Sequence, residues 1–485
     1  MGWDLVVLLV GPFLVAAVCW FAPAGAGRAL TLASGAGTFV LALLLVPTTG
    51  PTEALSGWLR VDALSIVFVV TVAFVYLATA VFSLGYLRPR GGAGDVLRYS
   101  RRFYAGLNVF AWSMIMAPLV DSLALLWVAI EVTTVVSALL VAIDGTDEAS
   151  EAAWKYVLIA SMGLGVALLA TVVVYFAGTA VFGDAYRLFD SKLLGAAGRL
   201  PGDPVRLAFV LAVVGFGTKM GLVPVHTWLP DAHSEAPTPV SALLSASLLA
   251  VSFYAILRYY QLAVRAVGAA FPRDVLLAFG LASLGLAALY LASQRDLKRL
   301  LAYSSVEHMG ILAIGMSFSA PIAVVGVLLH VLAHAAAKST AFFGAGSVIR
   351  RFGTKDLRRM RGGIGVLPWT GPMLVLAILG LSAMPPSGIF RSEFLIVSGG
   401  LSDPRDAVAA VLVVLVTLAS LGLSWFGTQT MMTPTDASAV RGETSRWMVA
   451  SMLIGLVALA LLGVHPPAPL SHLLTRAAHD LGASG

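Results

Sequence analysis

The chain has 485 residues, of which 59% are hydrophobic and 12% charged, and its mean hydropathy is +0.91. This composition excludes a water-soluble globular domain and is typical of a polytopic membrane protein. The formal net charge is +6, and the single cysteine, Cys19, excludes an internal disulfide, a cysteine-ligated zinc ion and a cysteine-ligated iron–sulfur cluster. Because the sequence has neither a P-loop nor a GxGxxG turn after a strand, no nucleotide or cofactor site is predicted.

Apolar runs long enough to cross a bilayer recur from one end of the chain to the other. They predict an all-α polytopic membrane protein with about 14 transmembrane helices. The runs are roughly 5–22, 28–47, 62–86, 104–119, 121–143, 154–178, 204–225, 238–262, 274–293, 302–318, 321–347, 366–400 (broken), 406–430 and 446–464.

Basic residues gather in three loops, which follow the third, ninth and eleventh runs. Their members are Arg88, Arg90, Arg98, Arg101, Arg102, Arg295, Lys298, Arg299, Arg350, Arg351, Lys355, Arg358, Arg359 and Arg361. Three odd-numbered spans end on the same side, which the positive-inside rule makes cytoplasmic. Both termini are then expected on the outer side. We interpret these residues as topology and lipid-headgroup contacts, with Lys298 and Arg299 anchoring a helix at the cytoplasmic surface, rather than as a nucleic-acid site.

The fifth run carries a glutamate, Glu131, about ten residues from either end. At 1.5 Å per residue this side chain lies roughly 15 Å deep, near the bilayer centre. A charge there costs at least about 2.5 to 3.5 kcal/mol, so the carboxyl group must be neutral or paired. We predict a place in a proton pathway, with Lys219 as its partner. A protonated glutamate that only packs helices together is the alternative.

The stretch 218–239 places Lys219 inside the seventh run and then interrupts that run with four prolines, two histidines and two acids. A bilayer tolerates charge and broken helix only where protein or water surrounds them. We therefore interpret this stretch as the inside of an ion path, with Lys219 as a proton carrier and snorkelling as its alternative. We assign His226 to the pathway and Asp231, His233 and Glu235 to its support; capping of broken backbone is the alternative for these four.

Three basic residues of the eleventh run, His330, His334 and Lys338, are spaced i, i+4, i+8. This spacing puts them along one slowly turning helix face, about 6 Å apart in rise. They predict a proton wire that includes hydration water. A two-histidine metal site is a rival, but no third ligand lies nearby in the sequence. A second alternative is that these residues only make structural hydrogen bonds.

The twelfth run is interrupted at 384–393, which contains Pro385, Pro386, Arg391 and Glu393. Glu393 is predicted to be the exit group for protons, and Arg391 a neighbour that tunes it. Because arginine does not deprotonate, a fixed ion pair between the two is the alternative.

The two interruptions, around 224–239 and 384–393, lie five runs apart. A repeat displaced by an odd number of spans is inverted across the membrane, and paired interrupted helices point to a transporter's ion site. We therefore expect N-terminal helices 1–3 over 1–103, inverted repeats over 104–265 and 266–432, and a last helix with a short tail over 433–485.

At these residues the chain resembles the proton-conducting antiporter-like membrane subunits of respiratory complex I, energy-converting membrane-bound hydrogenases and multi-subunit cation/proton antiporters. Three blocks carry the resemblance: Lys219 with 226–233, then 235–244, and 296–305. The resemblance implies that Glu131, Lys219, Lys338 with His330 and His334, and Glu393 form the pathway. The stretches 127–134 and 151–156 look most like the F-type component of hydrogenase-4 and formate hydrogenlyase.

One departure from the family concerns the stretch 250–254, where many members carry a lysine or histidine about thirty residues after the seventh-helix lysine. This chain has none there. The link from Lys219 to Lys338 is then expected to depend on water and on hydroxyl groups, those of Ser245, Ser247, Ser252 and Tyr254.

The resemblance implies a proton-translocating subunit of a redox-driven complex, similar to NADH:quinone oxidoreductase or to an energy-converting hydrogenase. No catalytic site, metal or cofactor of its own is expected. The expected partners are antiporter-like membrane neighbours, a redox arm and lipid, but no nucleic acid, in a bacterial inner membrane. A subunit of a multi-subunit cation/proton antiporter and a non-conducting scaffold are the alternatives.

Overall fold

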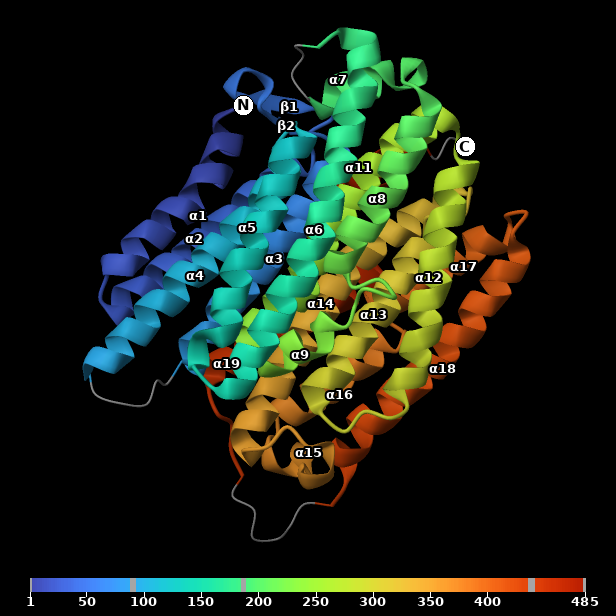
Figure 1. Ribbon diagram of the computed structural model, residues 1–485. Coiled ribbons are helices and arrows are strands. Elements are labelled where there is room, and N and C mark those ends of the chain that lie inside the picture. Colours follow the sequence, from blue (N-terminus) through green and yellow to red (C-terminus); the bar gives the residue numbers. More distant parts are fainter. Residues whose placement is uncertain (1, 88–92, 185–188, 435–440, 483–485) are drawn as a thin grey trace.

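The computed structural model describes residues 2–87, 93–184, 189–434 and 441–482, and these are nearly all helical (Figure 1). Arg88 and Arg90 of the first predicted basic loop lie outside the described residues. The helices of the first half are α1 (Trp3–Phe21), α2 (Ala24–Leu45), α3 (Ala63–Tyr86), α4 (Ala93–Leu119), α5 (Leu123–Val141), α6 (Asp147–Phe182), α7 (Asp190–Ala196), α8 (Gly202–Met220), α9 (Trp228–Glu235), α10 (Thr238–Leu243) and α11 (Leu249–Val267).

The second half continues the same up-and-down arrangement. Its helices are α12 (Ala270–Leu291), α13 (Leu297–Gly315), α14 (Pro321–Phe352), α15 (Gly363–Val366), α16 (Thr370–Leu381), α17 (Gly388–Leu401), α18 (Asp406–Met432), α19 (Arg446–Val464) and α20 (Ala468–Asp480). Short helical turns are η1 (Leu55–Gly57), η2 (Ala142–Asp144), η3 (Ala197–Arg199) and η5 (Leu357–Arg359), and a π-helical segment, η4 (Leu244–Leu248), joins α10 to α11.

Ten helices in the described part of the chain are long and apolar enough to cross a membrane. The remaining predicted runs are helical as well, but because they contain charged or polar residues or are interrupted, they are not counted among these ten helices. They are α4, α8, α13 and the broken pair of α16 and α17. A lipid environment forces backbone N–H and C=O groups to pair within their own segment, which helices achieve. The prediction of an all-α polytopic membrane protein is confirmed.

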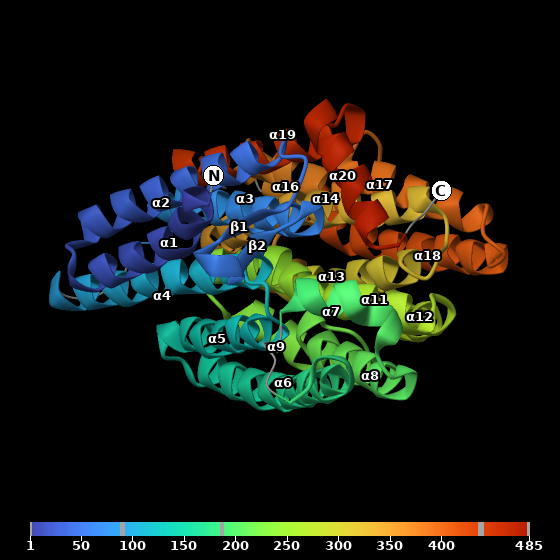
Figure 2. The same cartoon turned by 90° about the horizontal axis from the view of Figure 1, so that it is seen from above.

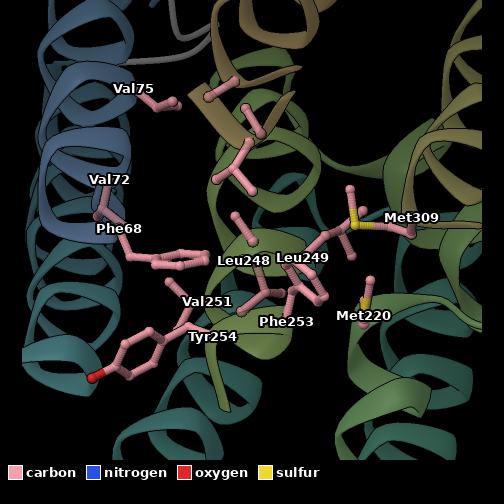
Figure 3. Close-up of a cluster of buried hydrophobic side chains, with 14 of the residues drawn as sticks. Phe68, Val72, Val75, Met220, Leu248, Leu249, Val251, Phe253, Tyr254 and Met309 are labelled. Atoms are coloured by element: carbon pink, nitrogen blue, oxygen red, sulfur yellow. The ribbon is translucent and has the colours of Figure 1, made fainter. Parts of the chain in front are cut away.

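The most buried helices lie at the centre of the bundle. The apolar windows of α3 and α14 are each 89% buried and that of 238–267 is 100% buried, whereas those of α1, α2 and α18 are at most 28% buried. Seen from above, α5, α6 and α8 lie on one side and α14, α16 and α19 on the other, with α13 between them (Figure 2). Side chains from α3, α8, α11 and α13 meet in an apolar core around Phe68, Met220, Phe253 and Met309 (Figure 3).

Both interruptions are shorter than predicted. The first covers 221–227, after which α9 forms a short helix; the second covers 382–387. Gly221 ends α8 with φ +87°, and a Cβ at this position would lie 2.5 Å from Cδ1 of Leu229. Ser387 accepts a hydrogen bond from the amide of Phe390 and so starts α17. As a result, Asp231, His233, Glu235 and Glu393 are helical residues rather than parts of a break.

The basic loops meet at one end of the molecule. Asp296 forms a β-bridge with Asp356, and Arg350 donates to the carbonyl of Tyr86 at the end of α3 (2.7 Å). Arg98, Arg101 and Arg102 belong to the first turns of α4 rather than to a loop. In Figure 1, α15 lies at this end, while both termini lie at the opposite end.

The end that carries the termini also has structure that the sequence pattern did not predict. A two-stranded antiparallel hairpin, β1 (Thr52–Ala54) and β2 (Leu59–Val61), leads into α3. The tail beyond α19 forms α20, a 13-residue helix that packs against α3 and α14. At 13 residues, α20 is shorter than a helix that crosses a bilayer.

Candidate functional site

Lys219 lies in the last turn of α8 and is completely buried. Its ammonium group donates to the hydroxyl of Thr134 on α5 (2.7 Å) and to the hydroxyl of Tyr156 on α6, and it lies 4.5 Å from the centre of the Tyr156 ring. Tyr156 in turn shares a hydrogen bond with Ser137 (2.7 Å). The lysine is therefore held by hydroxyl groups from two helices.

Glu131, the predicted partner of Lys219, makes no direct ion pair with it in the described part of the chain. Its carboxylate accepts a hydrogen bond from Ser161 (3.2 Å), while its second oxygen is buried without a hydrogen-bond partner. Thr134 lies three residues further along α5 and holds the lysine instead. The predicted partnership of Glu131 with Lys219 therefore takes the form of an open arrangement in this conformation, with Thr134 between the two groups along α5.

The short helix α9 ties the first interruption to its surroundings. Asp231 pairs with Arg299 (2.5 Å) and Lys155 (3.5 Å), and Glu235 pairs with Lys355 (2.7 Å). These acids connect α9 to α6, α13 and the loop after α14. In this conformation Asp231 and Glu235 thus hold α9 against its neighbours through ion pairs rather than cap broken backbone.

The two histidines of this region differ in their surroundings. His233 is completely buried, and its Nδ1 lies 2.7 Å from the carbonyl oxygen of Leu229 in the same helix. His226 lies in the interruption itself, is 7% exposed, and has a buried Nδ1 without a hydrogen-bond partner. Each histidine thus has one buried ring nitrogen without a hydrogen-bond partner, Nδ1 of His226 and Nε2 of His233.

Lys298 was expected at the cytoplasmic surface, and this expectation is wrong. The side chain is 4% exposed and donates to the carbonyl of Ala236 (2.6 Å) and to the hydroxyl of Ser241 (3.3 Å). It thus satisfies the backbone where α9 turns into α10. Arg299, which follows it, is exposed and pairs with Asp231.

Lys338, in the middle of α14, is also completely buried. Its ammonium group donates to the carbonyl of Leu301 (2.7 Å) and to the hydroxyl of Ser304, both on α13. One turn further along α13 come Glu307 and His308, which are buried as well. Sequence reasoning missed these two residues.

The histidines of α14 form a cluster with His308. Nδ1 of His308 lies 3.1 Å from Nε2 of His330, so that one ring donates to the other, and Nδ1 of His330 lies 2.9 Å from the hydroxyl of Ser392 on α17. The ring of His334 is 5.1 Å from that of His308, and both of its nitrogens lack a hydrogen-bond partner. The spacing on α14 therefore does bring His330, His334 and Lys338 toward one interior region.

Close packing of α14 against α17 positions this cluster. A Cβ at Gly326, one turn before His330, would lie 2.9 Å from the backbone oxygen of Ser392 and equally close to the amide nitrogen of Ile396. Only glycine permits so close an approach of the two backbones. The approach places the Ser392 hydroxyl within reach of His330.

Glu393 lies beside the histidine cluster and at the wall of a cavity. The side chain is 8% exposed. It lines a mostly apolar cavity of about 490 Å³ among α13, α16, α17 and α18, together with Ser382, Phe390 and Leu412. Glu393 therefore joins the interior cluster to a cavity at the edge of the bundle.

The hydroxyls expected to link the two lysines divide into two groups. Ser245, in the π-helical segment, shares a hydrogen bond with Ser305 of α13 (2.8 Å), and Ser247 is buried without a partner. Ser252 donates back to the carbonyl of Leu248 (3.0 Å). Tyr254 instead contacts Ser65 (3.1 Å) and belongs to a different cluster.

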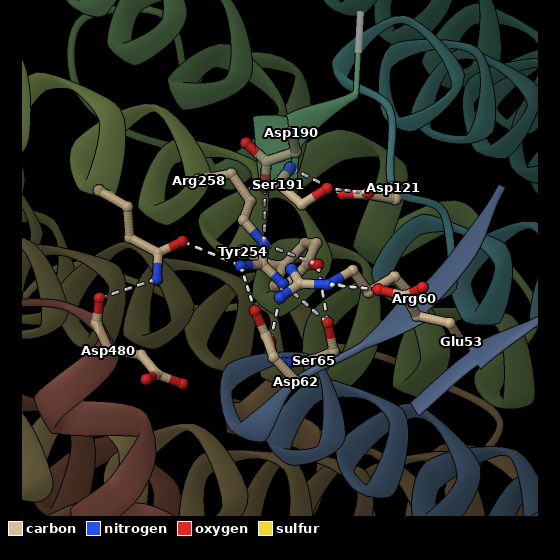
Figure 4. Close-up of polar contacts among 11 residues, drawn as sticks. Glu53, Arg60, Asp62, Ser65, Asp121, Asp190, Ser191, Tyr254, Arg258 and Asp480 are labelled. Atoms are coloured by element: carbon tan, nitrogen blue, oxygen red, sulfur yellow. Dashed lines mark hydrogen bonds and ion pairs between the residues drawn. The ribbon is translucent and has the colours of Figure 1, made fainter. Parts of the chain in front are cut away.

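That cluster, which we call the outer charge cluster, consists of Asp62, Ser65, Asp190, Tyr254 and Arg258 (Figure 4). The guanidinium of Arg258 contacts both oxygens of Asp62 (2.7 and 2.8 Å) and lies 3.6 Å from Asp190. Burial alone would raise the pKa of Asp62, but the charge and hydrogen bonds of Arg258 outweigh it and lower that pKa to about 2. Burial raises the pKa of Asp190 to about 6, against the opposing charge of Arg258.

Residues 120–422 match the family described as NADH:quinone oxidoreductase/Mrp antiporter, transmembrane. The match covers more than half of the chain. The chain belongs to this family.

A relative within it is "Hydrogenase-4 component F homolog" of Methylacidiphilum infernorum (isolate V4), which is 36% identical over 359 residues. The alignment covers 74% of this chain and 75% of the relative. The predicted resemblance to the antiporter-like subunits, and to the F-type component of hydrogenase-4, is confirmed.

Two solved structures share the fold of the present chain over nearly its whole length. A chain of the membrane-bound sulfane sulfur reductase, an archaeal respiratory membrane complex, has a TM-score of 0.84 at 20% identity and covers 98% of this chain and 97% of its own length. A chain of respiratory complex I from Thermus thermophilus has a TM-score of 0.82 at 23% identity, covering 99% and 100%. At these identities the likeness concerns the fold.

The structure supplies the third metal ligand that the sequence lacked, because His308, His330 and Glu393 each place a ligand atom within 4.8 Å of the others. However, both ring nitrogens of His330 are engaged, one with His308 and one with Ser392. A metal ion would have to displace the hydrogen bond between the rings. We expect the purified protein to contain no stoichiometric zinc by elemental analysis, and its proton flux to be unchanged by EDTA. Stoichiometric metal together with a loss of flux on chelation would favour the metal site.

Arg391 does not contact Glu393 as an ion pair in the described part of the chain. It donates to the carbonyls of Gly463 (3.3 Å) and Val464 (3.2 Å) at the end of α19. A cation that caps a helix C-terminus contributes about 0.3 to 1 kcal/mol. We therefore expect Arg391→Ala to keep proton flux within about two-fold of wild type and to lower the unfolding temperature slightly, with Arg391→Lys closer to wild type. Loss of flux in a stable Arg391→Ala protein would instead support a tuning role.

Proposed function

We propose that this chain is a proton-translocating membrane subunit of a redox-driven complex, of the type formed by NADH:quinone oxidoreductase or an energy-converting hydrogenase. The observation that carries the proposal is that Lys219 and Lys338 are both completely buried and that, among the described residues, their ammonium groups donate to neutral oxygens and form no ion pair. Burying an ammonium group among neutral oxygens costs free energy, and a lysine with only a structural role has no need of such surroundings. A lysine that exchanges protons does need them, because a direct ion pair would hold the proton on its nitrogen.

The proposed route starts at the interruption between α8 and α9, where His226 is available to deliver protons to Lys219. From Lys219 the route continues to Lys338 and His334 and leaves by Glu393 at the cavity among α13, α16, α17 and α18. The hydrogen bond between Ser245 and Ser305 is the contact between α13 and the η4 segment that supports the middle of this route. Water supplies the remaining steps.

Asp231 and Glu235 are proposed to support this route by holding α9 against its neighbours, and His233 by its contact with Leu229 inside α9. Glu131 is proposed to act on Lys219 through Thr134 and to couple the subunit to its neighbour. The repeats 104–265 and 266–432, each with one interrupted helix, remain the proposed organisation. The proposed location is a bacterial inner membrane, with the termini on the side opposite the basic loops.

The proposal about partners is supported by the name of one relative, a hydrogenase-4 component F homolog. We propose antiporter-like membrane subunits and a hydrogenase-like or quinone-reducing arm as neighbours. A multi-subunit cation/proton antiporter is the second candidate, because the family description includes the Mrp antiporter.

The test uses the purified complex in liposomes that contain a pH-sensitive dye. Proton uptake on addition of the electron donor, and none under a sodium gradient alone, is expected. Equal proton flux driven by a sodium gradient without a donor would favour the antiporter. If Lys338→Ala and Glu131→Ala damage assembly more than transport, the scaffold is favoured.

A further inference from the structure

We propose that Glu307 is a second proton-carrying carboxylate, which takes protons from Lys338 and passes them toward Glu393. This inference rests on the proposed function and adds a carrier to it. Glu307 is 1% exposed, in the middle of α13, the helix that lies between the two sides of the bundle (Figure 2). No ion pair in the described part of the chain includes it.

Glu307 lies on the same helix as the two groups that hold Lys338. The ammonium group of Lys338 is held by Leu301 and Ser304. Glu307 follows Ser304 by three residues, a rise of about 4.5 Å along the same helix. Its Oε2 is buried without a hydrogen-bond partner. A carboxylate with an unused acceptor thus lies one hydroxyl away from the lysine.

Lys219 repeats this arrangement, in which the lysine donates to a hydroxyl that lies three residues from a carboxylate on the same helix. There the hydroxyl is that of Thr134, and the carboxylate is Glu131, three residues away on the same helix, again with an unpartnered Oε2. In both places the lysine is bonded to the hydroxyl and not to the acid. A direct ion pair would hold the proton on the lysine, whereas this arrangement leaves the acid free to receive it.

Glu307 is also next in sequence to a residue that reaches Glu393, the proposed exit group. The next residue, His308, contacts His330, and both histidines place a nitrogen within 4.8 Å of a Glu393 oxygen. Along α13, Glu307 therefore lies between Ser304, which holds Lys338, and His308, which belongs to the group that reaches Glu393.

The proposed transfer conserves charge and needs no co-reactant. An N–H bond of the Lys338 ammonium group breaks and an O–H bond forms on the Glu307 carboxylate, which leaves a neutral amine beside a neutral acid. The Glu307 O–H bond then breaks as the proton moves, through the histidines or a water molecule, to the carboxylate of Glu393. No electron is transferred.

A purely structural Glu307 is the rival explanation. A buried carboxyl group that stabilises a helix bundle is expected to have its oxygens hydrogen-bonded, because an unpaired buried polar group costs free energy. The unpartnered Oε2 of Glu307 does not fit that role. The titratable groups around it are His308 on its own helix, His330, His334 and Lys338 on α14, and Glu393 on α17.

The test measures donor-driven proton flux of the whole complex in liposomes with Glu307→Gln, which keeps the size of the side chain and removes its proton exchange. We expect flux to fall by roughly 100-fold, the usual cost of removing a positioned acid–base group, and Glu307→Asp to restore part of it with a changed pH profile. The matched control is Glu148→Gln, an exposed acid in the first turn of α6, which is expected to behave as wild type.

Three outcomes decide the proposal. Wild-type flux in Glu307→Gln, with Lys219→Ala inactive, overturns the role of Glu307 and leaves the proposed function standing. Wild-type flux in both variants overturns the proposed function itself. If Glu307→Gln does not assemble, Glu307→Asp decides: a changed pH profile supports a carrier, and an unchanged profile with reduced stability shows a structural role.

Discussion

Replacing Lys219 with alanine is expected to abolish donor-driven proton translocation while the complex still assembles. The side chain is completely buried, and only hydroxyl groups of Thr134 and Tyr156 hold it, so its removal leaves two hydroxyls that can bond to water or to each other. Removal of a positioned proton donor and acceptor typically costs 100-fold or more in rate. We therefore expect less than roughly 1% of wild-type flux.

The measurement is the initial rate of proton uptake into liposomes, normalised to the amount of assembled complex. Lys192→Ala is the matched control, because Lys192 is an exposed lysine of α7 outside the membrane-spanning helices. Full pumping by Lys219→Ala would contradict the proposed route. A Lys219→Ala complex that falls apart, while Lys192→Ala is intact, would favour the scaffold.

Much of the fold could be predicted, because apolar length and the positions of breaks are local properties of a sequence. Lys219, His330, His334, Lys338 and Glu393 were found because a charge inside an apolar run is conspicuous. The same criterion applied to the run 302–318 would have found Glu307 and His308, which follow a block noted only for its resemblance.

Partners across helices could not be predicted in the same way. Glu131 was predicted to be the partner of Lys219, but the ammonium group of Lys219 is held by Thr134 and Tyr156, which the sequence did not single out. Arg391 was expected beside Glu393, yet its guanidinium reaches the end of α19. Such contacts depend on rotamers and helix rotation, which periodicity does not determine. The outer charge cluster was missed for a similar reason, because Arg258 near the end of the eighth run resembled an ordinary boundary residue.

Replacing Arg258 with alanine is expected to destabilise the protein by about 3 to 5 kcal/mol at pH 7.5. This is the usual cost of removing one partner of a buried ion pair, because the other charge is left uncompensated. Here two acids lose their cation: the side chains of Arg258 and Asp190 are 6% and 7% exposed and that of Asp62 is 15% exposed. The measurement is thermal or denaturant unfolding of the purified protein in detergent.

The pH dependence of this loss follows from the two carboxyl groups. The pKa of Asp190 is about 6 in the folded protein, above the value of about 3.9 for an unfolded chain, so its contribution to stability is full below pH 4 and is lost as the pH rises through 6. Asp62, with a pKa of about 2, contributes in the opposite sense, and its contribution is lost only as the pH falls from 4 toward 2. Between pH 5 and 7.5, Asp190 is therefore the residue of this cluster whose titration alters the free energy of unfolding of the wild-type protein, which decreases as the pH rises.

Without Arg258, both acids gain stability from taking up a proton, because protonation removes the uncompensated charge. The destabilisation by Arg258→Ala should therefore be largest at pH 7.5 and smaller at pH 5, and Asp190→Asn should flatten the wild-type dependence over this range. Arg265→Ala is the matched control, since Arg265 lies on the same helix but is exposed, and we expect a loss within about 0.5 kcal/mol. Equal losses in the two arginine variants, or a loss that grows at pH 5, would contradict the assignment of Arg258 as the cation that holds Asp62 and Asp190.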